Sequence, residues 1–501
     1  MGAMTAVRTA APSRPAVAWA ALGGPAVAVA LVLLSVAGRY GYHRDELYFL
    51  RAGSEPAFGY VDQPPLSPLL ARGMDAVFDG SLVGLRLPSA LAAGLVVLIT
   101  GLITRELGGG RGAQVLAAAC IAVSSVLLAV GHLFSTTTFD LLAWTALSWL
   151  VVRALRDGGP VWLGAGAVAG VALENKTLPL FLLAGLLAGV LAVGPRAALR
   201  SRWPWLGGLV ALVLWVPNLA WQAAHGFPQL ELSRAIAAGS SATSEPWYLF
   251  LPYQLLLVSP VLVPVWVAGW WRLARDPALR LWRAFAVAYP LVALTFLATG
   301  GKPYYLAGFY PVLLAAGAGP VLRWARRGAR RMRGALLGVA LALSLAVSAV
   351  VFLPLVPAAD LAGTPIPAVN PDAGETIGWP EFAATVATVR AGLPADERVA
   401  VLTANYGEAG AVDRLLPALA PAYSGHNSYG TWGPPPEGAT TVIVVGYPEG
   451  RVRAWFGRVD LAARIDNGVG LDDEEQGAPV WVARDRLAPW SQLWPQLVHL
   501  G

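Results

Sequence analysis

Five short stretches beside apolar runs carry charged and polar side chains. These stretches are His43-Arg44-Asp45-Glu46, Asp62 to Leu66, Asp140, Glu174 to Thr177 and Gly301 to Tyr305. Charged groups are costly at membrane depth, so those that persist beside apolar segments mark a functional site. Carboxylates of this kind can move protons, and lysines can hold an anion such as a phosphate.

The Asp45-Glu46 pair follows the first apolar run of the chain. Asp45 lies beside Arg44 and His43, where a carboxylate can be held ionised and aimed at a hydroxyl as a general base. Glu46 fits a catalytic and an orienting role equally well. Asp140 follows a hydroxyl-rich stretch, and it is a candidate helix N-cap or a second carboxylate that holds an acceptor.

Lysine usage points to a phosphate. The chain has 34 arginines but two lysines, Lys176 and Lys302, and both fall in the polar stretches. Lysine binds phosphate as a compact point charge, whereas arginine presents a planar fork. We therefore expect both lysines to face one phosphate. The alternative is that each extends to the lipid headgroups.

The surrounding elements must be membrane helices. The chain of 501 residues is 56% hydrophobic and 13% charged, and its mean hydropathy is +0.57. A spanning helix needs about 20 apolar residues. Eleven apolar runs are candidate spans, namely 16–37, 84–104, 113–131, 139–152, 160–173, 178–194, 203–221, 248–271, 284–299, 303–322 and 334–355.

The arginines predict the orientation, because basic residues are retained on the cytoplasmic side. With the N-terminus inside, 19 basic residues fall in inner segments, from Arg8 and Arg14 to the six between Arg323 and Arg333. The outer segments then hold eight. We expect a multi-pass protein of the plasma membrane with a cytoplasmic N-terminus. The first run is too long for a typical signal-peptide core and is expected to stay as an anchor.

The character of the sequence changes after residue 355. Residues 356–501 carry 9 basic and 17 acidic residues, whereas 1–355 carry 27 and 13. We expect a membrane domain over 1–355 and an extracytoplasmic α/β domain over 356–501. In the latter, 398–406 and 440–447 predict buried strands, and the stretch between them a helix that begins near Gly407. Its start, 405–408, suits anion binding or ordinary packing.

The order of these motifs resembles the polyprenyl-phosphate-sugar-dependent membrane glycosyltransferases of the GT-C superfamily. That group contains the protein O-mannosyltransferases and the lipid A aminoarabinose transferase. The resemblance covers roughly the first 320 residues. It rests on Asp45-Glu46 after the first span, Pro64-Pro65-Leu66 in the first outer loop, Lys176 before Thr-Leu-Pro, and Lys302 with Tyr304, Tyr305 and Pro311. Some relatives have a basic residue before the proline pair, where this chain has Asp62-Gln63.

The resemblance implies roles for several residues. It makes Asp45 the catalytic acid-base residue and Asp140 the second acid, with Glu46 as a further catalytic candidate. The groups that it implies for the lipid-linked phosphate are Lys302, Tyr304, Tyr305 and Lys176. The outer-loop motifs add three further substrate-binding candidates, which are His43, Arg44 and Gln63.

The implied reaction moves a sugar from a polyprenyl phosphate to an acceptor hydroxyl at the outer face. A base and no covalent intermediate predict inversion at the anomeric carbon, and the lysines stabilise the departing phosphate. The scheme requires no metal, although a divalent cation at the acids stays an alternative. We expect membrane lipids and a polyprenyl-phosphate sugar as partners and no nucleic acid. The acceptor stays open between glycan, lipid and protein.

Two other classes compete with a transferase. A transporter or flippase of a lipid-linked sugar also places charges at broken helices. However, the sequence has no inverted repeat and no acid near a bilayer midplane. A noncatalytic scaffold would use the C-terminal domain to bind wall polymers. The single cysteine, Cys120, excludes a disulfide framework and a thiolate metal site.

Overall fold

The computed structural model describes residues 12–239 and 246–501, which form two compact units. The helical unit contains residues 12–35, 87–220 and 246–349, and the mixed unit contains residues 36–86, 221–239 and 350–501. The mixed unit thus combines the first predicted outer loop with the predicted C-terminal domain. Arg8, which belongs to the predicted cytoplasmic tail, lies outside the described residues.

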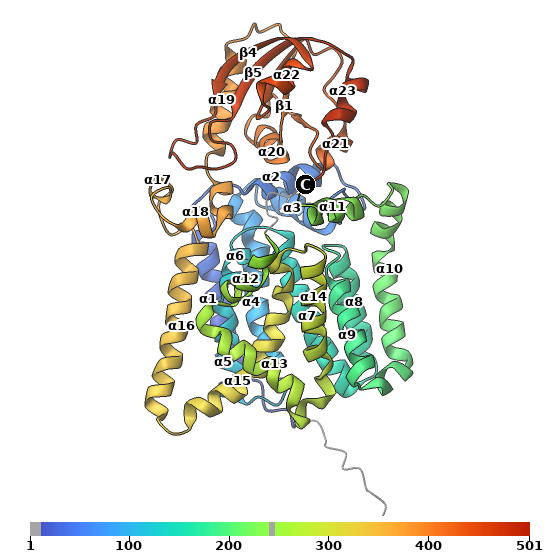
Figure 1. Ribbon diagram of the computed structural model, residues 1–501, viewed down its shortest axis with the longest axis vertical. Helices are drawn as coiled ribbons and strands as arrows, with labels where there is room; N and C mark the ends of the chain where they lie inside the picture. The colour runs from blue at the N-terminus through green and yellow to red at the C-terminus, as the bar shows by residue number, and fades with distance from the viewer. Residues whose placement is uncertain (1–11, 240–245) are drawn as a thin grey trace, which may run out of the picture. The chain divides into compact units, whose positions relative to one another are not determined.

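Long apolar helices dominate the first part of the chain (Figure 1). Those that lie wholly or largely in the helical unit are α1 (Trp19–Val36), α4 (Leu82–Glu106), α5 (Arg111–Ala122), α6 (Ser125–Gly131), α7 (Thr136–Asp157), α8 (Val161–Leu173), α9 (Pro179–Val193), α10 (Arg202–Ala224), α12 (Phe250–Val258), α13 (Val263–Arg275), α14 (Ala284–Ala298), α15 (Tyr310–Arg326) and α16 (Arg330–Phe352). Short 3₁₀ turns join some of them, namely η1 (Arg196–Arg200), η2 (Trp247–Leu249), η3 (Pro260–Leu262), η4 (Pro277–Trp282) and η5 (Pro303–Phe309).

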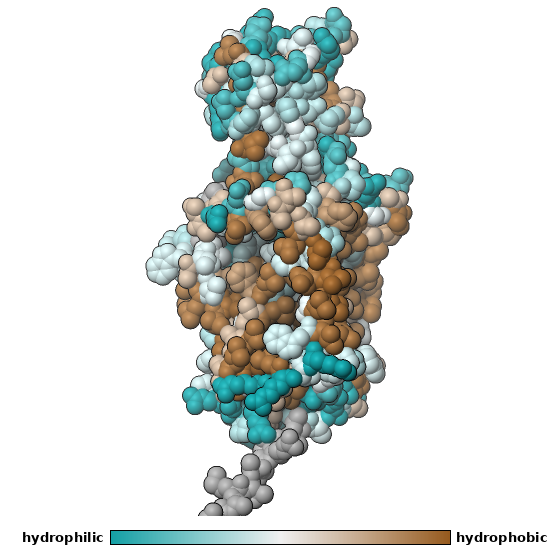
Figure 2. Space-filling model, turned by 90° about the vertical axis from the view of Figure 1, so that its right-hand side faces the viewer, coloured by the Kyte–Doolittle hydropathy of each residue, from teal (hydrophilic) through white to brown (hydrophobic). Residues whose placement is uncertain are grey.

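These helices make the chain a multi-pass membrane protein. Among the described residues, six helices are long and apolar enough to span a membrane, or up to eight if each of two bent pairs is one span. The bent pairs are α5 with α6, at 59°, and η2–α12 with η3–α13, at 80°. Every predicted run coincides with a helix or a bent pair, but three of the helices are short, so eleven spans stay a prediction. Apolar side chains cover much of the helical unit on the face in Figure 2.

Glycines allow close helix packing in the helical unit. A Cβ at Gly185 of α9 would lie 2.8 Å from Val292 Cγ2 and 3.3 Å from Ala288 Cβ of α14. Small residues at such crossings let two backbones approach and gain van der Waals contact, which drives helix association in lipid. The core around this crossing includes Trp144, Trp282 and Phe309, each fully buried.

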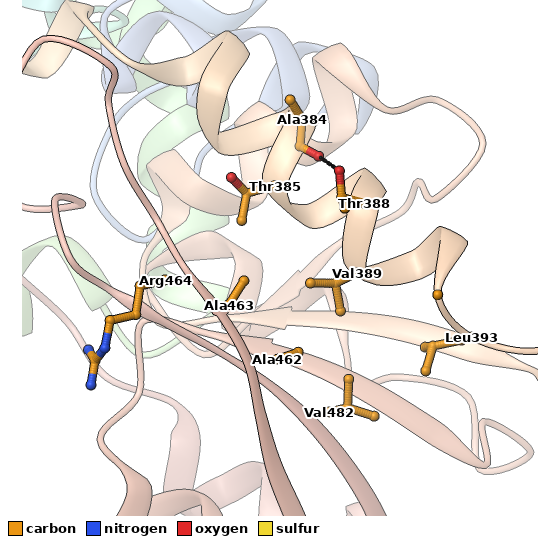
Figure 3. A pocket seen from close by; sticks show the side chains of 10 residues that line it. Ala384, Thr385, Thr388, Val389, Leu393, Ala462, Ala463, Arg464 and Val482 are labelled. Carbon is orange, nitrogen blue, oxygen red and sulfur yellow. Dashed lines mark hydrogen bonds between the residues drawn. The ribbon is translucent and has the colours of Figure 1, made fainter.

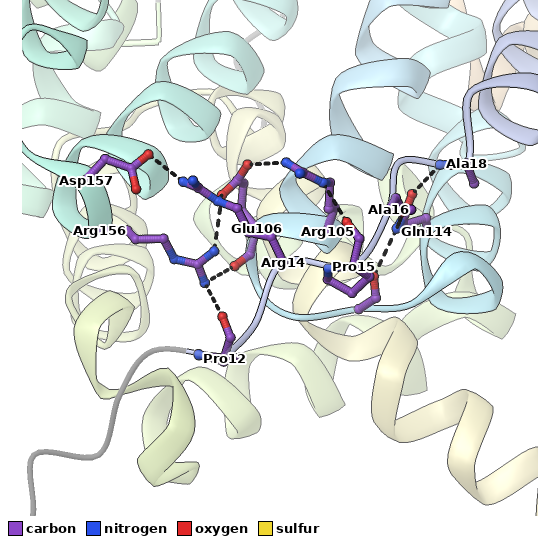
Figure 4. A network of polar contacts seen from close by, with 11 residues as sticks. Pro12, Arg14, Pro15, Ala16, Ala18, Arg105, Glu106, Gln114, Arg156 and Asp157 are labelled. Atoms are coloured by element: carbon purple, nitrogen blue, oxygen red, sulfur yellow. Dashed lines mark hydrogen bonds and ion pairs between the residues drawn. The ribbon is translucent and has the colours of Figure 1, made fainter.

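An ion-pair network joins three segments that were predicted to be cytoplasmic (Figure 4). Arg14 donates from Nε to Glu106 at the end of α4, at 2.6 Å, and from Nη2 to Asp157 at the end of α7, at 2.5 Å. Arg105 and Arg156 also pair with Glu106, at 3.0 and 3.4 Å. The N-terminal segment and the ends of α4 and α7 therefore lie at the same end of the helical unit.

The mixed unit contains a five-stranded sheet and shorter helices (Figure 1). Its strands are β1 (Val399–Thr403), β2 (Tyr423–Ser424), β3 (Thr441–Val445), β4 (Phe456–Arg464) and β5 (Pro479–Arg486). Its helices are α2 (Arg44–Ser54), α3 (Leu66–Val77), α11 (Pro228–Ala237), α17 (Ala358–Leu361), α18 (Ile366–Val369), η6 (Pro371–Thr376), α19 (Trp379–Ala391), α20 (Tyr406–Leu415), α21 (Ser428–Trp432), α22 (Glu449–Arg453) and α23 (Trp490–Leu497). The sheet and its helices confirm the small α/β fold predicted after residue 355.

The strand order is β2-β1-β3-β5-β4. β1 pairs in parallel with β2 and β3, whereas β5 pairs antiparallel with β3 and β4. The predicted strands at 398–406 and 440–447 correspond to β1 and β3, in register from Val399 opposite Thr441. Trp455, between α22 and β4, and Trp490 of α23 pack with strand residues such as Trp481 in one apolar core.

Helix α2 packs between α3 and α20 within this unit. Most of α2 is buried, including the consecutive residues Leu47, Tyr48 and Phe49. A Cβ at Gly410 of α20 would lie 2.8 Å from Leu47 Cβ, and one at Gly53 of α2 would lie 2.9 Å from Arg72 Cβ of α3. These close approaches fix the helix that carries the acid pair.

Candidate functional site

The first turn of α2 orients Asp45. His43 is the N-cap, and its Nδ1 accepts the backbone N–H of Asp45 at 3.2 Å, while Glu46 accepts the His43 N–H at 2.8 Å. This capping box satisfies two amide groups that a helix start leaves open. The Asp45 carboxylate is partly exposed, and its Oδ1 accepts a hydrogen bond from the Tyr406 hydroxyl at 2.8 Å.

Glu46 has no solvent exposure and is held by Arg86. Arg86 donates from Nε to Glu46 Oε1 at 2.8 Å and from Nη2 to Oε2 at 2.7 Å. The same guanidinium donates to the carbonyls of Ala37, at 2.6 Å, and Gly41, at 2.8 Å. Since both oxygens of Glu46 accept hydrogen bonds from the chain, this geometry fits the orienting role better than the catalytic one.

The Arg44 guanidinium lies among acids of the mixed unit. Its Nη1 pairs with Glu375 at 3.2 Å and with Glu474, and the side chain is buried. The pKa of Glu375 is raised by burial, and the Arg44 charge lowers it in part. Arg44 therefore neutralises carboxylates of its own chain, which leaves less of its charge for the substrate-binding role that the sequence suggested.

Asp62 forms a second carboxylate site beside the proline pair. Its Oδ1 accepts from the Tyr48 hydroxyl at 2.7 Å and its Oδ2 from Asn427 Nδ2 at 3.3 Å. Burial raises the pKa of Asp62 to about 7, although both hydrogen bonds oppose the rise. The neighbouring Gln63 is buried, and its Nε2 has no hydrogen-bond partner among the described residues.

The helical unit brings together three of the predicted polar stretches. Lys176 Nζ donates to Thr137 Oγ1 at 3.2 Å and lies 5.4 Å from the Tyr304 ring centre and 5.3 Å from that of Tyr305. It is also close enough to the buried Asp140 for their charges to interact. One lysine, one carboxylate and two phenols from distant parts of the sequence thus surround one point.

Hydrogen bonds from α12 and α15 hold the turn that carries Lys302 and the two tyrosines. Lys302 is the N-cap of η5. In that turn the Pro303 carbonyl accepts from Gln254 Nε2 of α12 at 2.8 Å, and Gln254 Oε1 accepts from the Tyr310 hydroxyl. Gln254 and Tyr310 are both buried, so the start of α15 and the turn before it are held together.

The predicted anion position at 405–408 is filled by the protein itself. Asn405 and Glu408 form a capping box, in which Glu408 accepts the backbone N–H groups of Ala404, at 2.8 Å, and Asn405, at 3.2 Å. Burial raises the pKa of Glu408 to about 7. The side chain of Asn405 also donates to Glu475 at 3.2 Å. This acidic surrounding favours the packing interpretation over anion binding.

Sequence reasoning missed several partners of the site residues. Tyr406, Arg86 and Thr137 each contact a predicted residue, but they lie 361, 40 and 39 positions away from it. The pattern Asn-Tyr-Gly-Glu at 405–408 is a capping-box signal that places a helix start. No local signal connects that start to Asp45.

A divalent cation at the acids is the alternative to a scheme without metal. Within residues 12–239 and 246–501, no three His, Cys, Asp or Glu side chains are grouped so as to hold a metal ion.

A separate hollow of about 620 Å³ lies between α19 and strands β4 and β5 and is lined by residues such as Thr385, Thr388 and Arg464 (Figure 3). None of the predicted site residues lines it.

The comparisons with known proteins confirm the resemblance. Residues 62–221 match the family described as dolichyl-phosphate-mannose-protein mannosyltransferase. Over 93% of this chain and 98% of the other, the fold is that of ArnT from Cupriavidus metallidurans, whose crystal structure contains bound undecaprenyl phosphate, with a TM-score of 0.60 and 15% identity. The arabinofuranosyltransferase AftD from Mycobacteria is also similar, with a TM-score of 0.53, 14% identity and coverage of 95% of this chain and 40% of that one. The chain therefore shares its fold with ArnT and AftD.

Curated proteins with similar sequences are aminoarabinose transferases. An undecaprenyl phosphate-α-4-amino-4-deoxy-L-arabinose arabinosyl transferase 2 of Pseudomonas fluorescens is 28% identical over 49% of this chain and 44% of its own length. A transferase 1 from the same species is 27% identical over 63% of this chain and 58% of its own length. The chain thus spans about half the length of the curated relatives that it matches. Its sequence is similar to those of these aminoarabinose transferases over that part.

Proposed function

We propose that this chain is an integral membrane glycosyltransferase that moves a sugar from an undecaprenyl-phosphate-linked donor to an acceptor. The observation that carries the proposal is the Lys176 site, where an ammonium, two phenols and a carboxylate meet within the helical unit. A polyprenyl phosphate is an anion on a lipid, so its recognition needs a cation at the edge of an apolar region. The names of the curated relatives supply the same donor class.

The proposed roles follow from residue chemistry. Lys176 and Lys302, with the hydroxyls of Tyr304 and Tyr305, bind the donor phosphate and stabilise the charge that it gains on leaving. Asp45 removes the proton of the acceptor hydroxyl, whose oxygen attacks the anomeric carbon while the bond from that carbon to the phosphate oxygen breaks. A single displacement of this kind inverts the anomeric centre.

The remaining site residues have supporting roles. Asp140 lies beside Lys176 and balances its charge before the donor binds, or holds the acceptor. Glu46 and His43 orient the first turn of α2 through the capping box and the Arg86 pair. Arg44 and Gln63 stay substrate-binding candidates, with Arg44 restrained by Glu375 and Glu474. The scheme uses no metal.

The proposal places the reaction at the outer face of the plasma membrane. The N-terminus is then cytoplasmic, and the α/β domain of residues 356–501 is extracytoplasmic, because the arginine-rich segments belong inside. The network of Arg14, Arg105 and Arg156 supports a shared side for three of those segments. The flippase alternative has no comparable support, since the matched relatives carry transferase names.

Replacement of Asp45 tests the proposal. Asp45→Asn keeps the size of the side chain and removes the proton acceptor, so turnover should fall at least 10²-fold to 10⁴-fold, the approximate range for loss of a general base. Binding of the donor lipid should stay unchanged. The measurement is release of undecaprenyl phosphate from undecaprenyl-phosphate pentoses and hexoses, beginning with the aminoarabinose donor, in source-cell membranes that contain the full chain.

Two further variants separate base loss from other damage. Lys302→Ala should weaken donor binding as well as turnover, because the phosphate charge is present before and during the reaction. Asp75→Asn is the matched control, since Asp75 lies on α3 of the same unit and pairs with Arg414 at 3.1 Å. Wild-type turnover by Asp45→Asn would contradict the proposed role of Asp45.

A further inference from the structure

The carboxylate of Asp45 has one side-chain partner. Its Oδ1 accepts from the Tyr406 hydroxyl at 2.8 Å, and among residues 12–239 and 246–501 no other side chain hydrogen-bonds to it. Tyr406 belongs to the sequence predicted as the C-terminal domain, whereas Asp45 follows the first apolar run. A residue of the α/β fold thus reaches the proposed base.

The start of α20 places Tyr406 at this position. The Asn405–Glu408 capping box makes Tyr406 the first residue of the helix. The next residue, Gly407, allows close packing on α2, because a Cβ there would lie 2.9 Å from Arg44 Cβ. Gly410 does the same one turn later, against Leu47. The two helix starts that carry Asp45 and Tyr406 are thereby held together.

The Tyr406 ring is restrained on several sides. Its centre lies 4.9 Å from that of Tyr48 and 4.7 Å from that of His426, and the Arg44 guanidinium lies 5.0 Å away. Burial, and next the charge of Asp45, raise the pKa of Tyr406 well above its usual value. The phenol therefore stays protonated near neutral pH and acts as a donor to Asp45.

We propose that Tyr406 is the positioning residue of the base, since it holds Asp45 Oδ1 and leaves Oδ2 to accept the acceptor proton. The inference rests on the proposed function and deepens it, because it gives the C-terminal α/β fold a part in catalysis. A carboxylate that accepts one fixed hydrogen bond keeps its remaining lone pairs in a constant direction, which favours attack by a correctly placed hydroxyl. Without the hydrogen bond from Tyr406, the carboxylate samples other rotamers.

The test removes one oxygen atom. Tyr406→Phe keeps the ring contacts and should lower kcat by about 10-fold to 100-fold, which is the range for a hydrogen bond to a charged group. The KM for the donor should stay within about twofold, because Tyr406 is not assigned to the phosphate. Turnover is measured as release of undecaprenyl phosphate from the aminoarabinose donor by the full chain in source-cell membranes.

Tyr429→Phe is the matched control. Tyr429 is a buried tyrosine of the same unit whose hydroxyl also donates to a carboxylate, Asp413, at 2.7 Å. Its loss should lower thermal stability about as much as Tyr406→Phe does while kcat stays within about twofold of wild type. Equal losses of kcat in both variants would mean that Tyr406 acts through stability alone, and the inference would be wrong.

A double-mutant cycle and a structure complete the test. In the Asp45→Asn background, Tyr406→Phe should cost no further turnover, because the side chain that it positions no longer works as a base. Additive losses would overturn the inference while leaving the proposed function intact. Cryo-electron microscopy of the Tyr406→Phe chain should show a displaced Asp45 carboxylate. An unchanged carboxylate would overturn the inference, and this measurement does not depend on the choice of sugar donor. Wild-type turnover by Asp45→Asn would instead overturn the proposed function and the inference with it.

Discussion

Three carboxylates near the proline pair and the first turn of α2 differ in their surroundings more than in their chemistry. Asp45 is partly exposed, and its carboxylate accepts a hydrogen bond from one tyrosine hydroxyl. Glu46 is buried and bound at both oxygens by Arg86. Asp62 accepts from Tyr48 and Asn427. Only Asp45 among the three combines an open oxygen with access to solvent, which suits a group that must take a proton.

The pH dependence of stability tests the surroundings of Asp62. Its pKa is raised from 3.8 to about 7 in the folded protein, so its contribution to stability is complete below about pH 4 and is lost as the pH rises through about 7. Asp62→Asn cannot ionise and should lose less stability than wild type between about pH 4 and pH 7. Thermal unfolding of both proteins across that range checks the difference, and equal slopes would contradict it.

The sequence predicted the residues whose chemistry is unusual for their place in the chain. Asp45, Lys176 and Lys302 could be found because charge is rare beside apolar runs. Arg86 and Tyr406 could not, because nothing in the sequence distinguishes them from the other 33 arginines and 13 tyrosines, and their partners are distant. Glu46 shows the limit of residue type alone, since burial and an ion pair, rather than the side chain itself, decide between acid and orienting group.

At the scale of elements, the close crossing of α2 and α20 holds the acid pair. An added methyl at Gly410 would meet Leu47 Cβ at 2.8 Å and its carbonyl carbon at 3.1 Å. Gly410→Ala should therefore separate the helices, lower the stability by about 1–3 kcal/mol as overpacking does, and reduce turnover because Tyr406 moves with α20. Thermal unfolding and donor turnover measure the two effects.

Gly73→Ala is the control for that variant. Gly73 lies on α3 in the same unit, and a Cβ there would have nothing within 4 Å. Alanine should be neutral or stabilise the helix by up to about 1 kcal/mol, with turnover unchanged. A Gly410→Ala protein as stable and active as wild type would show that the crossing tolerates separation.

The positions of helices and strands along the chain were easier to predict than the directions of their axes. Short apolar runs located β1 and β3, and Gly407 located the start of α20. The run 113–131 reads as one continuous span, but the structure bends it by 59° between α5 and α6. Hydropathy sums apolar character along the chain and contains no term for the direction of the axis. The Ser124-Ser125 pair, which stands at the bend, is a local signal that such a sum does not register.

At the scale of the whole molecule, the arginine-rich segments predict which ends of the helices face the cytoplasm. An alkaline phosphatase fused after Gly501 should be active, because that enzyme needs an oxidising compartment, and a fusion after Arg333 should be inactive. A fusion after Gly158, just beyond the Arg14 network, is the control for a cytoplasmic position and should also be inactive. Activity that is absent after Gly501 would contradict the proposed orientation.

The hydrogen bond between Tyr406 and Asp45 also has a consequence for the order of synthesis. It joins residues that are 361 positions apart, so the partner of Asp45 is translated roughly 20–70 s after Asp45 at about 5–20 residues per second. During that interval α2, whose Leu47 lies against Gly410 in the folded protein, lacks α20. A newly made chain therefore cannot fix its proposed base until Tyr406 has been translated, and a ribosome that stalls before Tyr406 leaves a polypeptide without the hydroxyl that holds the Asp45 carboxylate.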